Sequence, residues 1–357
     1  MTQHRRPFKD GYFMPAEWAP HRRCWMAWPC REEAWGDDLD LVRDAYAEVA
    51  SAIAGFEPVT MIANPENVAE VSIRCGNGVG TLSLSHDDSW TRDNGPTFLI
   101  DGAGNLAGVD WTFNAWGERY QPYDQDAALA GELIRHIQAD HYPTSLVTEG
   151  GAIHTDGEGT LLVVEPSIVN DNRNPGLSRD EVEIELLAFT GTKKVIWLPF
   201  GLVGDETDGH VDNVACFLRP GEVIVQAPGD KADINYANYR SNLSALEAAT
   251  DAKGRALSIL ELPSPKPRRR HTGEWLALSY VNFYLPNGGV VMPSFDDDSA
   301  DNKAFDILSK AFPDREVAQI QVLPILEGGG GIHCITQQEP TGILDNADKN
   351  RKLPFEI

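Results

Sequence analysis

One cysteine near the C-terminal end of the sequence lies in surroundings that suit covalent catalysis. Cys334 follows four glycines at positions 328–331 and stands at the start of a short apolar run. Because glycine has no Cβ, such a run lets the backbone turn sharply and approach another group closely. The same residues also fit a loop that leads to a buried core cysteine, so the rest of the chain has to decide between a nucleophile and a core residue.

A histidine with a carboxylate two residues away could serve that thiol. A cysteine attacks as its thiolate, which a nearby imidazole or another favourable partner stabilises. His210 stands in the sequence Asp208-Gly-His-Val-Asp212, and residues two apart in a strand point to the same face. Asp212 could therefore orient the ring or bind substrate beside it. The stretch by itself also fits an ordinary surface or core histidine.

The carboxylates nearby indicate the class of substrate. Asp93, Glu149 and Asp212 around a thiol would repel an anion. They complement the fork of donors on a guanidinium, which carboxylates bind in a bidentate manner. Trp90 and Trp116 could lay an aromatic face against a cation or an alkyl stem, or could be simple core residues. We therefore expect a small cationic guanidine as the substrate.

Zinc catalysis is an alternative that the ligand types allow but the spacing does not favour. Suitable side chains are His154, His210, His333, Cys334, Asp212 and Glu149. The sequence contains no HExxH, no CxxC and no HxE followed by PCxxC. It also lacks a P-loop and the GxGxxG spacing of a dinucleotide site. We therefore expect neither a metal nor an organic cofactor.

Composition narrows the class of protein further. The 357 residues carry a formal net charge of −24, which argues against non-specific binding to nucleic acid or to an anionic membrane. Five cysteines form no CxxC pair and no even disulfide framework, so a reducing compartment is expected. No signal peptide and no apolar run of about 20 residues is present, which predicts a cytoplasmic protein. The oligomeric state is left open, with a homo-oligomer among the alternatives.

A recurring unit organises most of the chain: polar residues, a strand, a glycine-containing turn and a second strand. It is predicted at 94–109, 151–164, 209–225 and 279–292, and in a truncated form at 331–336. Helices are predicted between these hairpins at 126–139, 178–191, 235–250 and 299–312, the second opened by a capping box. Ahead of them, strands are predicted at 25–29, 59–63 and 81–84, and helices at 37–55 and 67–73.

Repeats of this kind usually pack around an axis, so equivalent positions in each unit should converge. The polar residues that open the units would then form one central site. They are Trp90 and Asp93, Glu149 and His154, His210 and Asp212, Asn282, and His333 and Cys334. Carboxylates, imidazole and thiol at the same phase of each repeat favour Cys334 as a nucleophile.

Several motifs in the same order make the chain similar to a known family. They lie at 14–18, 25–29, 88–96, 109–117, 149–160, 172–175, 206–213 and 328–340. With them the chain resembles the agmatine deiminase family of guanidine-modifying enzymes, which is related to a bacterial type of peptidylarginine deiminase. The resemblance implies an α/β fold, a five-module pseudo-fivefold β/α propeller, in which residues 1–357 form a single catalytic domain.

The resemblance also implies roles for individual residues. Cys334 would be the nucleophile, His210 the general acid and base, and Glu149 the carboxylate near the leaving amine. Asp93 and Asp212 would clamp the guanidinium. Attack by the thiolate would release ammonia and leave an S-alkylthiouronium intermediate, which water would hydrolyse to a ureido product without metal or organic cofactor.

One departure from the family limits the expectation for the substrate. The segment 117–126 is short, whereas many agmatine-specific relatives have a longer glycine-rich loop there. Glu118, Asp124 or Glu206 could still receive a distal ammonium, so agmatine, which would give N-carbamoylputrescine, is the first expectation. The alternatives are another guanidine, such as free or peptidyl arginine, and a non-catalytic cation-binding protein. The basic run 268–271 is predicted to be a solvated loop.

Overall fold

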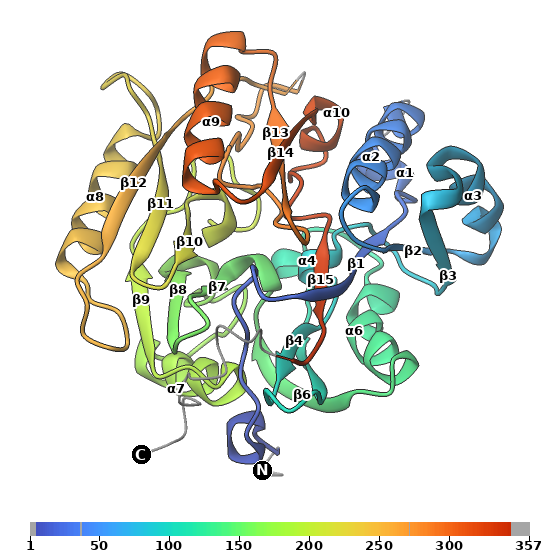
Figure 1. Cartoon of the computed structure of the whole chain (residues 1–357), viewed down its shortest axis with the longest axis horizontal. Helices are drawn as coiled ribbons and strands as arrows, with labels where there is room; N and C mark the ends of the chain where they lie inside the picture. The colour runs from blue at the N-terminus through green and yellow to red at the C-terminus, as the bar shows by residue number, and fades with distance from the viewer. Residues whose placement is uncertain (1–4, 36–37, 271, 344–357) are drawn as a thin grey trace.

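The strands form five sheets, which Figure 1 shows around the middle of the molecule. The structure is a computed structural model that describes residues 5–35, 38–270 and 272–343. Three sheets share one arrangement, an antiparallel hairpin whose second strand pairs in parallel with a third strand. These are β4-β5-β6 (Thr97–Ile100, Leu106–Thr112, Asp140–Val147), β7-β8-β9 (Ile153–Thr155, Thr160–Val164, Lys194–Leu198) and β10-β11-β12 (Ala215–Arg219, Glu222–Ala227, Ser258–Pro263).

The other two sheets connect distant parts of the chain. Strands β13 (Gly289–Ser294) and β14 (Glu316–Gln321) pair in parallel. The fifth sheet has the order β15-β1-β2-β3, with bounds Gln337–Pro340, His21–Ala27, Val59–Ala63 and Val79–Ser83. In it β15 runs antiparallel to β1, so the strand that follows Cys334 is held by the first strand of the chain.

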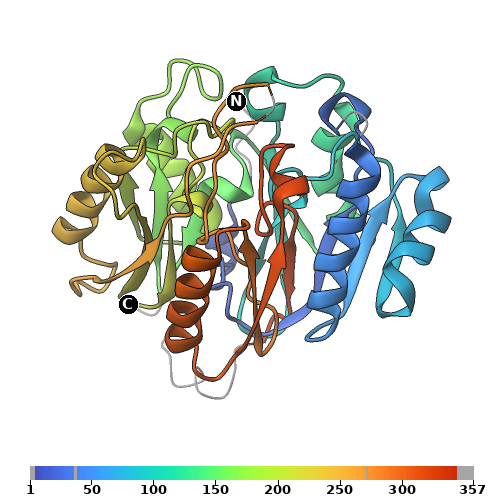
Figure 2. The same cartoon turned by 90° about the horizontal axis from the view of Figure 1, so that it is seen from above.

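A helix connects each pair of parallel strands, and most of the longer helices lie outside the strands (Figures 1 and 2). These helices are α2 (Leu39–Ala54), α3 (Val68–Cys75), α6 (Asp124–His136), α7 (Arg179–Thr190), α8 (Tyr236–Ala248) and α9 (Asp298–Ala311). The shorter ones are α1 (Glu32–Trp35), α4 (Thr91–Asn94), α5 (Ala115–Glu118) and α10 (Leu323–Leu326). Short 3-10 turns lie at η1 (Pro7–Asp10), η3 (Pro65–Asn67), η4 (Gly76–Gly78), η5 (Gly150–Ala152), η6 (Glu165–Ser167) and η7 (Val211–Asn213).

Local sequence accounts for many of these bounds. Ser178 caps α7 through the predicted capping box with Glu181, and the left-handed Gly191 ends the helix. In α2 the predicted apolar stripe, including Val42 and Ile53, is fully buried. Part of the predicted helix 37–55 cannot be compared, because residue 37 lies outside the described residues. In the described part of the chain, none of the helices combines the length and the apolar character that a membrane span requires.

The last two predicted hairpins differ from the structure. In the fourth, the first predicted strand does not form, and a single antiparallel bridge joins Tyr284 to Val291 of β13. In the fifth, residues 331–336 form a turn, and the strand begins three residues after Cys334. Its antiparallel partner is β1, more than 300 residues earlier in the chain. The prediction of a strand that contains Cys334 was therefore wrong, and a tight turn presents the thiol instead.

Candidate active site

Segments from four parts of the sequence line one pocket. The residues that line it are Trp90, Asp93, Trp116, Tyr120, Glu206, Thr207, Gly328, Gly329, Gly330 and Cys334. Five predicted site residues therefore share one cavity, and the predicted glycine run forms part of its wall. The glycines are needed there, because a Cβ on Gly330 would lie 2.5 Å from the Trp90 ring and 2.9 Å from the Cys334 Cβ.

The Cys334 thiol is buried and lies between an amide and a carboxylate. The Asn282 amide nitrogen lies 3.3 Å from the sulfur, and the thiol faces Asp212 Oδ2 at 3.6 Å. Burial, together with the negative charges of Asp212 and Asp93, raises the pKa of the Cys334 thiol well above its usual value. The thiol is therefore protonated at neutral pH.

The His210 ring lies between two carboxylates. Its Nε2 is 3.3 Å from Glu149 Oε2, and its Nδ1 is 3.7 Å from Asp93 Oδ1. Burial alone would lower the pKa of His210, but Asp93 and Glu149 raise it to about 10. His210 is therefore an imidazolium at neutral pH, and it can donate a proton before it accepts one.

Asp93 is held by two donors that the fold places on either side of it. Its Oδ1 accepts a hydrogen bond from the Gly151 amide at 3.0 Å, and its Oδ2 accepts one from the Trp116 indole at 2.9 Å. Trp116 reaches this position from a left-handed backbone conformation with φ 55°. Burial raises the pKa of Asp93 to about 6, although His210 opposes the shift. Asp93 is therefore an anion at neutral pH and a neutral acid below about pH 6.

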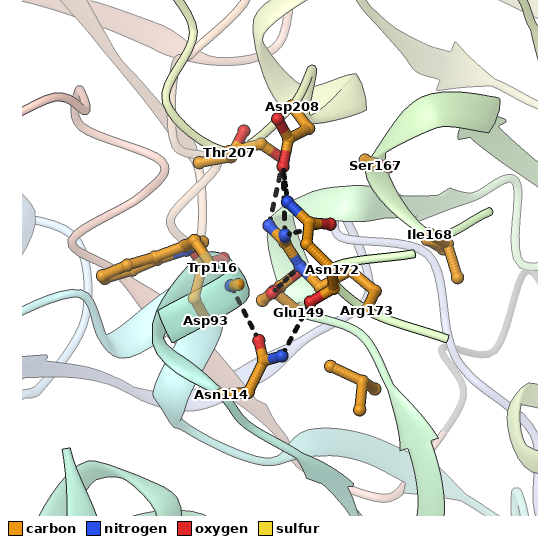
Figure 3. A network of polar contacts seen from close by, with 12 residues as sticks. Asp93, Asn114, Trp116, Glu149, Ser167, Ile168, Asn172, Arg173, Thr207 and Asp208 are labelled. Carbon is orange, nitrogen blue, oxygen red and sulfur yellow. Dashed lines mark hydrogen bonds and ion pairs between the residues drawn. The ribbon is translucent and has the colours of Figure 1, made fainter. Parts of the chain in front are cut away.

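A buried arginine fixes Glu149. Arg173 Nε donates to Glu149 Oε1 at 2.7 Å, and Arg173 Nη1 donates to Asp208 Oδ2 at 3.0 Å. Figure 3 shows how this arginine lies between the two carboxylates, with Asn172 also bonded to Asp208. Both side chains of the Arg173–Glu149 pair are fully buried. Sequence reasoning included Arg173 in a family motif but gave it no role, because a contact across 24 residues leaves no local signal.

A second buried chain of charges supports Asp212. His333 Nδ1 lies 2.8 Å from Asp212 Oδ2, and His333 Nε2 lies 2.8 Å from Glu17 Oε1. Arg92 approaches Glu17 at 3.5 Å, and the Arg92 amide donates to the Cys334 carbonyl at 3.2 Å. Burial would raise the pKa of Asp212, but the bond to His333 holds it below its usual value. Glu17 and Arg92 lie within the family motifs at 14–18 and 88–96, but the sequence analysis gave neither residue a role.

The remaining predicted residues take different places. Glu206 also lines the pocket, and Tyr120 donates a hydrogen bond to it at 2.6 Å. His154 lies outside the pocket, with its Nε2 3.6 Å from Glu17. Glu118 and Asp124 are exposed and do not line the pocket. Within the described ranges, no group of three or more His, Cys, Asp or Glu side chains is arranged to hold a metal ion.

The basic run does not behave as a freely solvated loop. The Arg270 guanidinium forms an ion pair with Glu206, and its side chain is only 14% exposed. Arg269 covers the ring of Trp275, with its guanidinium carbon 3.6 Å from the ring centroid. His271, the last residue of the predicted run, lies outside the described residues.

Comparison with known proteins places the chain in a family of deiminases. The model of the Porphyromonas-type peptidyl-arginine deiminases matches residues 13–340. The agmatine deiminase of Stutzerimonas stutzeri is 44% identical, and the match covers 94% of this chain and 97% of that protein. The solved agmatine deiminase of Enterococcus faecalis superposes with a TM-score of 0.92 at 34% identity, covering 96% of this chain and 99% of the other. A solved agmatine deiminase of C. jejuni gives 0.82 at 26% identity, with 93% and 97% covered.

The family match over residues 13–340, together with the mixed α/β fold and the buried thiol, shows that the chain belongs to the class of the Porphyromonas-type peptidyl-arginine deiminases. It is a hydrolase that acts on C–N bonds. Within the class, the length and coverage of the matches show that the chain belongs to the agmatine deiminase family.

Proposed function

We propose that this protein is an agmatine deiminase that hydrolyses the guanidinium of agmatine to N-carbamoylputrescine and ammonia. The observation that carries the proposal is the set of charges around Cys334. Asp93 and Asp212 both act on the thiol, and burial leaves little water to screen them. Such a pocket favours a compact cation. The relatives named above as agmatine deiminases support the choice of agmatine.

The guanidinium supplies the charge that activates the nucleophile. Asp93 and Asp212 raise the pKa of the Cys334 thiol. A guanidinium bound between them offsets their charge and so lowers that pKa, and the thiol proton is released to solvent. The thiolate then attacks the guanidinium carbon and forms a neutral tetrahedral adduct. This order of events makes thiolate formation depend on the substrate.

His210 then acts as an acid and afterwards as a base. As an imidazolium it donates its proton to the departing amine, so ammonia leaves and a cationic S-alkylthiouronium remains. The neutral imidazole next takes a proton from water, and the resulting hydroxide adds to the same carbon. Collapse of this second adduct breaks the C–S bond, the proton of its hydroxyl passes to the departing sulfur, and the ureido product and the Cys334 thiol are released. Glu149 keeps the ring close to the reacting carbon through its contact with Nε2.

The architecture that we propose is a single catalytic domain. We infer that the five sheets are modules of a pseudo-fivefold β/α propeller formed by residues 1–357. The repeated hairpin-and-parallel-strand arrangement of three sheets supports this interpretation, as does the convergence of four separate segments of the chain on one pocket. Each module would contribute one or two polar residues to the central site.

An assay of ammonia and ureido product with agmatine, free arginine and a peptidyl arginine tests the proposal. Release from agmatine is expected, and its absence would refute the choice of substrate. Cys334→Ser should abolish turnover, and a thiol-alkylating reagent should inactivate the enzyme in a way that agmatine protects against. A Cys334→Ser variant as active as the parent would refute the covalent mechanism. Loss of activity to a chelator, restored by added metal, would favour the zinc alternative.

A further inference from the structure

An arginine of the chain itself forms an ion pair with Glu206, one of the two carboxylates that line the pocket. Arg270 Nη1 binds Glu206 Oε1, and Tyr120 donates to Glu206 Oε2 at 2.6 Å. Both oxygens of the Glu206 carboxylate are therefore engaged within the protein. The ion pair lies against the pocket wall, because a Cβ on Gly329 would lie 3.3 Å from Arg270 Nη2 and 3.4 Å from Glu206 Oε2.

Backbone hydrogen bonds and side-chain packing hold the segment that carries Arg270 in place. The Arg270 amide donates to the Glu274 carbonyl at 2.8 Å, and the Leu276 amide donates to the Arg268 carbonyl at 3.0 Å. Arg269 stacks on Trp275 beside it. Trp275 in turn packs against Gly204, where an added Cβ would lie 2.8 Å from the Trp275 Cβ. These contacts fix the backbone of the segment close to Glu206.

The pairing of Arg270 is nevertheless incomplete. Its Nε is buried and has no hydrogen-bond partner among the described residues. An arginine with a purely structural role normally places its N–H donors in hydrogen bonds, and a buried N–H without a partner is unfavourable. The side chains of Arg270 and Glu206 are 14% and 25% exposed, so water can reach the pair and another cation can compete for the carboxylate.

We propose that Arg270 is a specificity-determining residue, an internal counter-cation that a substrate's distal ammonium has to replace on Glu206. This inference rests on the proposed deiminase function. Glu206 alone would favour a cationic tail, whereas the Arg270–Glu206 pair carries no net charge and gives such a tail no advantage until Arg270 moves. The pair therefore lowers the preference for agmatine over an alkylguanidine with a neutral tail. The apparent affinity for agmatine is reduced by the fraction of enzyme in which Glu206 is free.

Two substrates that differ only at the tail measure this effect. Pentylguanidine carries a methyl group where agmatine carries its ammonium. The measured quantity is the ratio of kcat/KM for agmatine to kcat/KM for pentylguanidine. Arg270→Gln should lower KM for agmatine by about two- to fivefold, as expected for the loss of a partly exposed ion pair. It should leave kcat and the constants for pentylguanidine unchanged, so the ratio rises.

Two further variants separate competition from structure. Glu206→Gln should bring the ratio close to one, because the variant lacks the carboxylate that binds the ammonium of agmatine. Arg268→Gln is the matched control, since Arg268 lies in the same segment but binds the Asp296 carbonyl, and it should leave the ratio unchanged. Arg270→Lys keeps the charge and should give a ratio between those of the parent and Arg270→Gln.

Each other outcome overturns the inference in a recognisable way. A ratio that stays constant or falls in Arg270→Gln would mean that Arg270 only orients Glu206. A selective loss of activity on free arginine would mean that Arg270 binds a substrate carboxylate. If Arg270→Gln does not fold, Arg270→Met takes its place, and a ratio for Arg270→Met equal to that of the parent refutes competition. If the parent enzyme turns over neither agmatine nor pentylguanidine, the proposed function itself fails, and that result is distinct from all of these.

Discussion

A single methyl group at Gly151 should damage catalysis without removing any functional side chain. Gly151 lies in η5, and a Cβ built there would be 2.5 Å from His210 Nδ1, 2.9 Å from Asp93 Oδ1 and 3.0 Å from Asp212 Oδ2. Ordinary van der Waals contact begins at 3.4 Å, so His210 would have to retreat by about 1 Å. The backbone of Gly151 is not in the left-handed region, so alanine adds crowding and no backbone strain.

The magnitude follows from that displacement. A misplacement of about 1 Å in a catalytic group costs on the order of 100-fold in rate, and we expect this loss in kcat/KM for Gly151→Ala. The added volume should also lower the free energy of unfolding by about 1–3 kcal/mol, as overpacking of a core does. The Gly151 amide can still donate to Asp93, so the carboxylate itself is retained.

Steady-state kinetics of ammonia release together with urea denaturation test this prediction. Gly229→Ala is the control, because a Cβ there meets nothing within 4 Å, and its kinetics and stability should stay close to those of the parent. A Gly151→Ala enzyme whose kcat/KM lies within about threefold of the parent would refute the argument that the position of His210 limits the reaction.

Three other perturbations have defined outcomes. The kcat/KM of the parent should fall as pH drops through about 6, because Asp93 has its pKa raised to that value and only the anion, present above it, binds a guanidinium; a rate profile that stays flat down to pH 5 would contradict this. Arg173→Met should lower the free energy of unfolding by about 3–5 kcal/mol in urea denaturation, because it leaves the buried Glu149 charge without its partner. His333→Gln should raise KM and move the acidic limb of the pH profile to higher pH, because the imidazole that lowers the pKa of Asp212 is lost; an unmoved limb would show that His333 has no such role.

The sequence was informative about elements with a strong local pattern. The amphipathic stripe of α2 and the capping box of α7 are fixed by neighbours within a turn, and both are present. The first three hairpins were recognisable from glycine turns between apolar runs. The third strand of each of those sheets was not predicted, because β6, β9 and β12 pair in parallel after a helix and their pairing depends on tertiary packing.

The same division holds for the site. The residue types of Cys334 and His210 indicated a nucleophile and a general acid and base, and the repeat predicted that the two side chains converge. Their supporting partners could not be found in this way. Glu17 contacts His333 across 316 residues, and Arg270 contacts Glu206 across 64. The spacing of residues in the sequence does not reveal such distant pairs, and a charged residue in a loop usually faces solvent.

The pairing of β15 with β1 sets the point in synthesis at which the active site can be completed. Trp25 in β1 donates to Glu339 in β15 at 2.9 Å, across 314 residues, and the turn with Cys334 lies just ahead of that strand. During synthesis the ribosome delivers the acids and the imidazole long before it delivers the thiol. We therefore expect a growing chain to have no deiminase activity until β15 pairs with β1. Loss of the β15–β1 pairing would free the turn that holds Cys334, so we expect it to abolish activity even though the acidic residues and His210 are unchanged.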